Sequence, residues 1–342
     1  MAQTSRNNVI EDKILLAHGS GGKMMHDLIE SFIPRLANPI LSKMDDSAVF
    51  ELNGKAAFTT DSYTVQPLFF PGGDIGKLAV CGTVNDLAMS GAQPLYLSLA
   101  LIIEEGLIIS DLKKIVESIA AAADEAGVEI VTGDTKVVGK GMADRIFINT
   151  AGVGSIPNGV NISASNARPG DKIIISGTIG DHGIAVMAQR EGLKFSTPIP
   201  SDCAPLNGLT AVMLAVTKDI HAMRDPTRGG LAVTLNDFAE KSRVGIVIEE
   251  QKIPIAKEVR AACELLGLDP LHIANEGKLV AAVAQDKAES VLKAMRQHKY
   301  GKNAVIIGEV VDKHPGRVAM KTLLGASRII DMPVGELLPR IC

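Results

Sequence analysis

Aspartates that stand beside glycine or small polar residues are the most prominent chemical feature of this sequence. They form six clusters: Asp45-Asp46-Ser47, Thr60-Asp61-Ser62, Asn85-Asp86, Gly133-Asp134-Thr135-Lys136, Gly180-Asp181-His182-Gly183 and Asp225-Pro226-Thr227-Arg228-Gly229-Gly230. Mg²⁺ prefers oxygen ligands, usually one or two carboxylates completed by phosphate oxygens and water. Glycines let the backbone approach a phosphate closely. Clusters that converge on one cleft would form a Mg-nucleotide site, whereas any single cluster could be ordinary turn chemistry.

A glycine-rich loop near the N-terminus is a second candidate for phosphate binding. It reads His18-Gly19-Ser20-Gly21-Gly22-Lys23 and could fold over phosphates. It is not a Walker A loop, because the glycine spacing differs and Met24 follows the lysine. An ordinary linker is the alternative interpretation of this stretch.

The last residue, Cys342, is a candidate nucleophile. The eleven residues after Asp331 could span about 35 Å if fully extended, so the thiol could move between two sites. The adjacent terminal carboxylate disfavours the thiolate, so activation would have to come from a site that the tail enters. An incidental exposed thiol is the alternative. Cys81, Cys203 and Cys263 stand in apolar or helical surroundings and are expected to be buried.

Short aliphatic runs that alternate with amphipathic stretches predict a mixed α and β protein. Helices are expected over 110–127 and within 71–91 in the first half, and over 206–216, 230–241, 256–266 and 287–298 in the second. Strands are expected over 95–103, 128–132, 171–176, 244–248, 279–283 and 304–310. The stretch 155–170 is rich in Asn, Ser, Pro and Gly and indicates a domain boundary. Two prolines and a glycine within 328–342 predict an extended tail.

Composition excludes several classes of function. The 342 residues carry 35 Lys and Arg against 39 Asp and Glu, a net charge of −4, which argues against nucleic-acid binding. The most apolar run, 95–103, is about half the length that a membrane span needs. The polar N-terminus lacks an apolar signal core, and no Cys-x-x-Cys pair is present. We therefore expect a cytoplasmic protein with no membrane segment and no bound transition metal.

Seven stretches combine into one recognisable pattern. In chain order they are LAHGSGGKMM (16–25), TDSYTVQPLFFPGGDIGKLAVCGTVNDLAMSGA (60–92), TGDTKVV (132–138), SGTIGDHG (176–183), RDPTRGG (224–230), ANEGKL (274–279) and the final Pro339-Arg340-Ile341-Cys342. This combination resembles the HypE family of carbamoyl dehydratases, which help to make the cyanide ligands of nickel–iron hydrogenases. The wider relatives are PurM-like ATP-using enzymes. The resemblance implies a mixed α/β, PurM-like two-domain fold with a flexible C-terminal tail.

The resemblance also implies a division of the chain and a set of site residues. It suggests an N-terminal segment over 1–40, a domain over 41–158 that binds ATP and dimerises, a second domain over 168–325 and a mobile tail over 326–342. Mg²⁺ ligands would be Asp45 or Asp46, Asp61, Asp86 and Asp225. ATP would contact Gly19, Ser20, Gly21, Gly22, Lys23, Asp61, Ser62, Asn85, Asp134, Thr135, Thr227 and Gly229.

The chemistry implied by the family begins with a carbamoyltransferase, HypF, which would place a carbamoyl group on Cys342. ATP would then phosphorylate the carbamoyl oxygen, and loss of phosphate would leave a thiocyanate. We propose Glu276 as the base, working with Lys136; a capping or salt-bridge role is the alternative for Glu276. The HypC–HypD complex would accept the cyanide, and the protein would be a homodimer. Other possibilities are a PurM-like kinase or synthetase such as a selenophosphate synthetase, although the glycine-rich loop lacks the reactive sulfur of those enzymes, and a non-catalytic thiol carrier.

Overall fold

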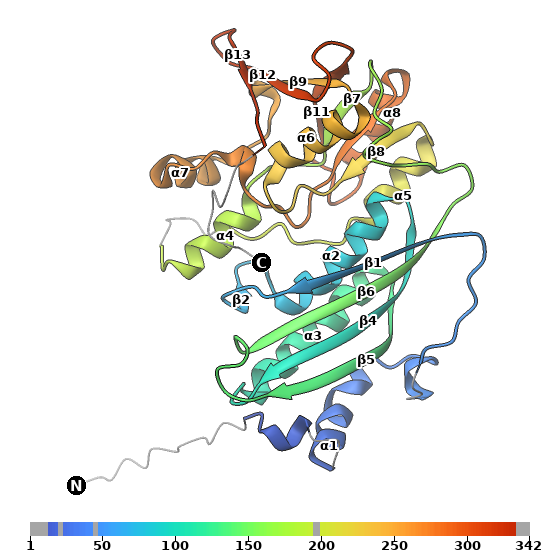
Figure 1. Ribbon diagram of the computed structural model, residues 1–342, viewed down its shortest axis with the longest axis vertical. Coiled ribbons are helices and arrows are strands. Elements are labelled where there is room, and N and C mark those ends of the chain that lie inside the picture. The colour runs from blue at the N-terminus through green and yellow to red at the C-terminus, as the bar shows by residue number, and fades with distance from the viewer. Residues whose placement is uncertain (1–12, 20–22, 44–46, 194–198, 333–342) are drawn as a thin grey trace.

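The computed structural model describes residues 13–19, 23–43, 47–193 and 199–332, in which two β-sheets are each packed against helices (Figure 1). The first sheet has four strands in the order β1-β6-β4-β5. Their bounds are β1 Lys55–Tyr63, β4 Gln93–Glu104, β5 Glu129–Val138 and β6 Ile146–Ile156. Strand β5 runs parallel to β4, and the other neighbours are antiparallel.

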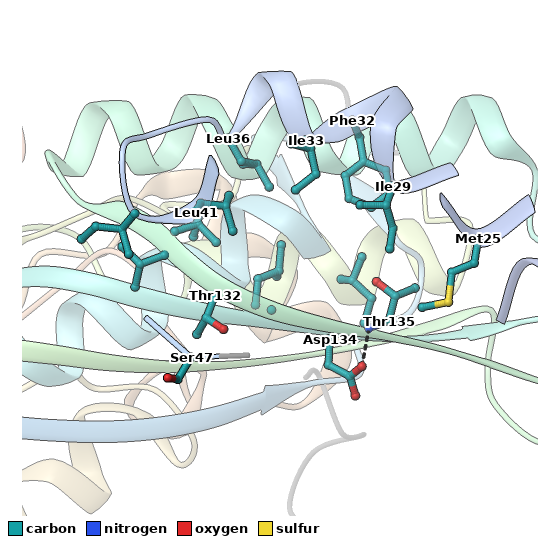
Figure 2. Close-up of a pocket in the computed structure, with 16 residues that line it drawn as sticks. Met25, Ile29, Phe32, Ile33, Leu36, Leu41, Ser47, Thr132, Asp134 and Thr135 are labelled. Atoms are coloured by element: carbon teal, nitrogen blue, oxygen red, sulfur yellow. Dashed lines mark hydrogen bonds between the residues drawn. The ribbon is translucent and has the colours of Figure 1, made fainter. Parts of the chain in front are cut away.

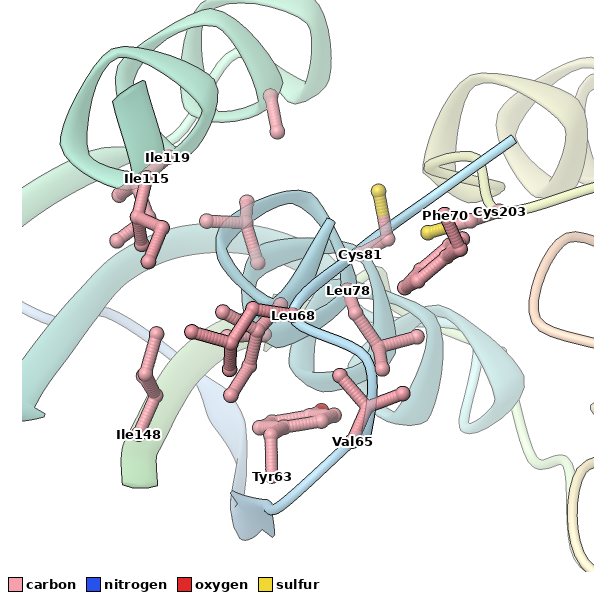
Figure 3. Close-up of a cluster of buried hydrophobic side chains, with 14 of the residues drawn as sticks. Tyr63, Val65, Leu68, Phe70, Leu78, Cys81, Ile115, Ile119, Ile148 and Cys203 are labelled. Atoms are coloured by element: carbon pink, nitrogen blue, oxygen red, sulfur yellow. The ribbon is translucent and has the colours of Figure 1, made fainter. Parts of the chain in front are cut away.

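Two helices cover one face of the first sheet. Helix α2 (Ile75–Met89) begins at Asp74, whose carboxylate accepts hydrogen bonds from the Gly76 and Lys77 backbone N–H groups. Helix α3 (Ile109–Ala126) ends at Gly127, which adopts the left-handed conformation that suits glycine. Figure 3 shows the buried cluster formed where α2 and α3 meet the strands, with side chains such as Leu78, Ile119 and Ile148. The helix expected over 110–127 is thus confirmed.

The opposite face of the first sheet carries no helix among the described residues (Figure 1). Alternation along the strands places Phe58, Tyr96, Ile102 and Phe147 on this face. Phe58 is 71% exposed and Ile102 is 42% exposed. We call this the open sheet face.

The second sheet has seven strands in the order β13-β12-β9-β11-β7-β10-β8. Their bounds are β7 Lys172–Ile175, β8 Ile220–Arg224, β9 Gly245–Glu249, β10 Val280–Val283, β11 Val305–Val311, β12 Arg317–Lys321 and β13 Ser327–Ile329. Helix α6 (Gly230–Ser242) packs on one face through Leu235 and Phe238. Helices α5 (Asn207–Val216) and α8 (Gln285–Gln297) pack on the other face of this sheet. They form a separate core with the strand side chains that point to that face.

The remaining elements connect and flank the two sheets. They are η1 Leu16–Gly19, α1 Lys23–Phe32, η2 Ile33–Arg35, η3 Leu41–Lys43, β2 Phe69–Phe70, β3 Gly73–Asp74, α4 Asp181–Arg190, η4 Glu250–Lys252, α7 Lys257–Leu266 and η5 Pro270–His272. Helix α2 contacts α5 and β8, so the first sheet's helix layer also touches the second half of the molecule. Among the described residues, no helix combines the length and the apolar character needed to cross a bilayer.

The structure extends some of the predicted elements. The strand expected over 128–132 continues to Val138 because β5 stays paired with β4 beyond Gly133. A Cβ atom on Gly133 would lie 2.5 Å from the Leu99 carbonyl oxygen, so this glycine permits close strand approach and does not end the strand. In the segment expected to be a tail, β13 pairs with β12 and Ile330 is buried. The Asn236 side-chain amide donates to the Ile330 carbonyl over 3.0 Å, which anchors the chain there.

Candidate functional site

A cavity of about 400 Å³ brings together acidic residues that lie far apart in the sequence. Three of the predicted metal ligands, Asp61, Asp86 and Asp225, line it. The other lining residues are Thr60, Ser62, Tyr63, Thr64, Gly82, Arg224, Thr227, Arg228 and Glu276. We call this cavity the acidic cleft. Predicted candidates Asp45 and Asp46 lie outside the described residues, as do Ser20, Gly21, Gly22 and the tail residues Pro339, Arg340, Ile341 and Cys342.

Each acidic residue reaches the cleft from a different element. Asp61 lies near the end of β1, on the same strand face as Thr59. The Thr59 hydroxyl donates to Asp86, on the last turn of α2, over 3.0 Å. Asp225 directly follows β8, and the loop after it leads into α6. The cleft therefore lies where β1 and α2 of the first half meet the β8–α6 connection of the second.

Burial, together with the negative charge of neighbouring carboxylates, raises the pKa of Asp86 and of Asp225. Partial burial is the main cause of the raised pKa of Asp86, and the negative charge of Asp61 adds to it. Burial, followed by repulsion from Asp86, raises the pKa of Asp225 to about 7. Arg224 and Arg228 line the cleft and partly offset this repulsion at Asp86. A divalent cation would relieve the same repulsion, so the donor set fits a hard metal ion.

The carboxylates do not form a complete metal cage by themselves. Within the described ranges, no group of three or more His, Cys, Asp or Glu side chains is close enough to hold a metal ion. Mg²⁺ commonly takes only one or two protein carboxylates and completes its shell with phosphate oxygens and water. The arrangement therefore suits a metal ion that arrives with a nucleotide.

Glu276 enters the cleft from a buried loop before β10. The residue is 5% exposed, and its backbone N–H donates to the Asp202 carboxylate over 3.1 Å. Its backbone carbonyl accepts a hydrogen bond from the Asn85 side chain over 3.2 Å. The backbone of this loop is thus held from two sides, and its side chain lines the cleft.

Asn85 lies one position before Asp86 on α2, but it does not line the acidic cleft. Its side chain is 1% exposed and also donates to the Ala204 carbonyl, while its oxygen accepts from the Leu206 N–H. Successive helical residues point about 100° apart, so Asp86 faces the cleft and Asn85 faces the second half of the chain. Here the amide joins the two halves of the molecule.

Asp134, Thr135 and Lys136 lie at a distance from the acidic cleft. Asp134 shares a cross-strand row with Ala100, Asn149 and Ser62, so three strand spacings, or roughly 14 Å, separate it from Ser62. Lys136 is also on the open sheet face and forms an exposed ion pair with Asp134 at 3.3 Å. These residues do not line the acidic cleft in a single copy of the chain.

A second cavity, of about 330 Å³, lies between α1 and β5 (Figure 2). Asp134 and Thr135 line one side of it, and the Thr135 N–H donates to the Asp134 carboxylate over 2.9 Å. The side near α1 is apolar, with Met25, Ile29 and Phe32. From the glycine-rich loop, Gly19 lies at the end of η1 so close to β5 that a Cβ would be 2.7 Å from the Val137 Cβ.

Two glycines at the site have no room for a side chain. A Cβ on Gly229 would be 2.2 Å from Val233 Cγ2, and its φ of 77° lies in the left-handed region. A Cβ on Gly82 would be 2.2 Å from the Tyr63 hydroxyl oxygen. That hydroxyl is buried without a hydrogen-bond partner among the described residues. The Thr83 hydroxyl near it is already bonded to the Thr150 hydroxyl at 2.5 Å.

Several residues of the site were not predicted from the sequence. Tyr63 and Gly82 fall inside the block 60–92, and Arg224 and Arg228 inside the block 224–230. Their presence in these family-like blocks is the feature of the sequence from which a role at the site could have been predicted. Asp202, which holds the Glu276 backbone, lies in no such block. The predicted burial of Cys81, Cys203 and Cys263 is confirmed, and Figure 3 shows Cys81 and Cys203 side by side.

Comparison with known proteins gives matches over nearly the whole chain. Residues 44–156 match the N-terminal domain of the AIR synthase related proteins, and residues 168–321 match their C-terminal domain. Carbamoyl dehydratase HypE of Azotobacter vinelandii is 53% identical over 340 residues, which cover 99% of this chain and 100% of that protein.

Solved structures give the same result. The crystal structure of the hydrogenase maturation protein HypE in complex with ATP has a TM-score of 0.93 and 49% identity, and the match covers 96% of this chain and 99% of that one. HypE in a HypE–HypF complex has a TM-score of 0.80 and 55% identity, covering 91% and 100%. A thiamine-monophosphate kinase from Stenotrophomonas maltophilia, at 22% identity and a TM-score of 0.66, shares the fold.

Proposed function

The chain belongs to the HypE family of carbamoyl dehydratases within the AIR synthase related proteins, and we propose that it dehydrates a carbamoyl group carried on its own Cys342 at the expense of ATP. The family resemblance and the PurM-like mixed α/β fold expected from the sequence are both confirmed. The observation that carries the proposal is the convergence of Asp61, Asp86 and Asp225 with Glu276 in one cleft. In this proposal the nucleotide and the candidate base share one cavity.

Mg-ATP is the nucleotide that we assign to the acidic cleft. The related HypE structure in complex with ATP supports a nucleotide site in this fold. One or two of Asp61, Asp86 and Asp225 would bind Mg²⁺ directly, with Asp45 or Asp46 as a further candidate ligand from outside the described residues. The ion would neutralise negative charge on the transferred phosphoryl group. Thr227 and Arg228 lie on the same cavity wall and would contact phosphate oxygens.

The proposed reaction converts a poor leaving group into a good one. Transfer of the γ-phosphoryl group to the carbamoyl oxygen forms a C–O–P linkage, and cleavage of that C–O bond releases inorganic phosphate. The nitrogen loses both protons as the C≡N bond forms, so S–C(=O)–NH₂ and ATP give S–C≡N, ADP, phosphate and a proton. Glu276 would take up a proton from the nitrogen, and the position of its side chain in the cleft supports this role.

Lys136 and Asp134 enter this proposal through a second copy of the chain. Both residues lie on the open sheet face, where Phe58 and Ile102 are exposed. Burial of such apolar side chains favours association. We propose a homodimer that covers this face, in which Asp134 and Lys136 would belong to the interface. Lys136 would act as the second catalytic group only in that assembly.

The partners follow from the family and from the chemistry. The HypE–HypF complex of a relative supports a HypF-like carbamoyltransferase as the donor that loads Cys342. A HypC–HypD complex would accept the cyanide. We expect the reaction to take place in the cytoplasm, where ATP is available.

Intact-mass analysis of the C-terminal peptide tests the proposal. The full chain would be incubated with HypF, carbamoyl phosphate and Mg-ATP, with Cys342→Ala as the control. We expect addition of one carbamoyl group to Cys342, followed by ATP-dependent loss of one water, and neither change in the control. A peptide of unchanged mass alongside ATP consumption with a small molecule would assign the protein to the kinases or synthetases. Carbamoylation without any use of ATP would make it a carrier.

A further inference from the structure

We propose that Asp202 is a positioning residue for the dehydration step, acting through its bonds to the Glu276 backbone and to Lys278. This inference rests on the function proposed above, because it concerns the orientation of Glu276. Asp202 lies on the loop that precedes α5, and its side chain is 3% exposed. It does not line the acidic cleft, so it would act on the reaction only through its neighbours.

The two oxygens of the Asp202 carboxylate have different partners. Oδ1 accepts the backbone N–H of Glu276 over 3.1 Å, and Oδ2 pairs with the Lys278 Nζ at 3.0 Å. The Lys278 side chain is 12% exposed and lies 3.8 Å from the Asp181 carboxylate as well. The buried Asp202 carboxylate therefore bonds to both Glu276 and Lys278, the residues on either side of Gly277.

The charge on this carboxylate is maintained inside the protein. Burial acts to raise the pKa of Asp202, but the positive charge of Lys278 and the hydrogen bond from the Glu276 N–H outweigh it, so the pKa is lowered. An ionised acceptor forms a stronger hydrogen bond to a backbone N–H than a neutral one does. Asp202 is thus suited to fix the loop rigidly.

The same loop has little freedom elsewhere. A Cβ on Gly277 would be 1.8 Å from the Asp202 carbonyl oxygen, so the two backbones are in direct contact. Asn275 donates to the Pro226 carbonyl over 2.9 Å and accepts from the Gly180 N–H over 2.8 Å. Loss of the Asp202 bond removes the partner of the Glu276 N–H and should therefore shift the Glu276 side chain locally. Because the bonds of Asn275 remain, this change should not open the nucleotide site. Misplacement of a reacting group by about 1 Å can cost about 100-fold in rate.

Asp171 provides a matched control, which tests whether Asp202 contributes only to the stability of the fold. Asp171 is also 3% exposed and accepts hydrogen bonds from the Arg168 N–H and the His221 ring. It lies at the start of β7 and lines no part of the acidic cleft. Asp171→Ala therefore removes a buried, hydrogen-bonded carboxylate from the other end of β7, away from the Glu276 loop.

The experiment compares Asp202→Ala, Asp202→Asn and Asp171→Ala in the full chain with HypF, carbamoyl phosphate and Mg-ATP. For Asp202→Ala we expect the rate of water loss from carbamoylated Cys342 to fall about 100-fold. Cys342 carbamoylation and the KM for ATP should stay within about twofold. Asp202→Asn should recover about tenfold of the loss, because its amide oxygen still accepts the Glu276 N–H. Asp171→Ala should keep the rate within about threefold.

Three results would overturn the inference alone: an unchanged rate in Asp202→Ala, an equal fall in folded Asp171→Ala, or no recovery in Asp202→Asn. If Asp202→Ala does not fold, Asp202→Asn decides by itself: a fall of about tenfold at constant KM for ATP supports the inference, and an unchanged rate contradicts it. Absence of water loss in the unmodified protein would instead overturn the proposed function, and this inference with it.

Discussion

The side-chain amide of Asn85 donates a hydrogen bond to the backbone carbonyl of Glu276 over 3.2 Å, and so links α2 of the first half to the loop that carries the candidate base. The two residues are 191 positions apart in the sequence. The bond is buried, and the same amide also reaches the Ala204 carbonyl and the Leu206 N–H. Asn85 is therefore one of the side chains that fix the Glu276 loop relative to α2, which carries Asp86 of the acidic cleft.

Replacement of Asn85 by aspartate should impair catalysis and stability together. A carboxylate would face two buried carbonyl oxygens in place of the amide donor, which should cost about 3 kcal/mol of unfolding free energy. The rate of water loss should fall about 100-fold. Asn38→Asp is the matched control, since Asn38 also donates to two carbonyls and accepts from backbone N–H groups. An equal loss of rate in that variant, measured at the same folded fraction, would contradict the role given to Asn85.

Asp225→Asn should lower activity and raise the stability of the nucleotide-free protein. With a pKa near 7 in the fold, the carboxyl binds more protons than it does in the unfolded chain between about pH 4 and 7. Its ionisation therefore reduces stability as the pH rises through this range. The variant should gain about 1 kcal/mol at pH 8, after allowance for solvent screening, and nothing at pH 4.

Chemical denaturation at the two pH values measures this gain, and ATP-dependent water loss should fall about 100-fold in the same variant. Asp111→Asn, at an exposed ion pair on α3, is the control and should change neither quantity. A variant that is less stable than the unmodified protein at pH 8 would show that Asp225 is not under electrostatic strain.

Phe58→Glu should dissociate the proposed homodimer. A charge at this 71% exposed position on the open sheet face would remain unpaired and buried if a second copy covered it. Light scattering coupled to size exclusion should show a dimer for the unmodified chain and a monomer for the variant. Leu324→Glu, at a residue 96% exposed, is the control and should stay dimeric. A monomeric unmodified chain would refute the proposal.

His182 should make the protein less stable as the pH falls. Burial lowers the pKa of its imidazole to about 4, so the folded protein resists the proton that the unfolded chain accepts below about pH 6.5. Stability should therefore drop by about 2 kcal/mol between pH 7.5 and pH 5. His182→Gln should abolish this part of the pH dependence in urea denaturation, and His26→Gln, on the exposed side of α1, should retain it.

Tyr63→Phe should stabilise the protein. The substitution removes a buried hydroxyl that has no hydrogen-bond partner among the described residues, which should contribute about 1 kcal/mol. Tyr300→Phe provides the contrast, because the Tyr300 hydroxyl donates to Glu125 and its loss should cost about 0.5–1 kcal/mol. Thermal denaturation of both variants would test the pair, and a destabilised Tyr63→Phe would show that the hydroxyl has a partner.

The elements with strong periodicity could be predicted from the sequence, and the exceptions have physical reasons. Helix α3 was predicted to within one residue at each end, because its apolar positions recur at helical spacing and Gly127 ends it. Strand β5 was expected to end before Gly133, since a Gly-Asp pair commonly indicates a turn. That glycine instead allows β4 and β5 to approach, a requirement that comes from the neighbouring strand and is not visible in local sequence.

The residue types of the site were predictable, but their arrangement was not. Asp61, Asp86 and Asp225 are separated by up to 164 positions, and only the packing of β1, α2 and β8 brings them to one cavity. Asn85 and Asp86 form one motif in the sequence. On the helix, however, their side chains point about 100° apart, so the Asn85 amide bonds to the second half of the chain and the Asp86 carboxylate lines the cleft. Asp202 carries no motif at all, because its role depends on a contact with Glu276 that is 74 positions away.

The anchor at Ile330 has a kinetic consequence. Cys342 follows Met332, the last described residue, by ten positions, so its thiol can lie no more than about 35 Å from Met332. A reactive group on so short a tether has an effective local concentration in the millimolar range. For the proposed dehydration, the local concentration of the carbamoylated thiol at its own site therefore does not fall when the protein is diluted. Water loss should be first order in loaded protein at protein concentrations where the proposed homodimer persists, and a Michaelis constant would exist for ATP alone.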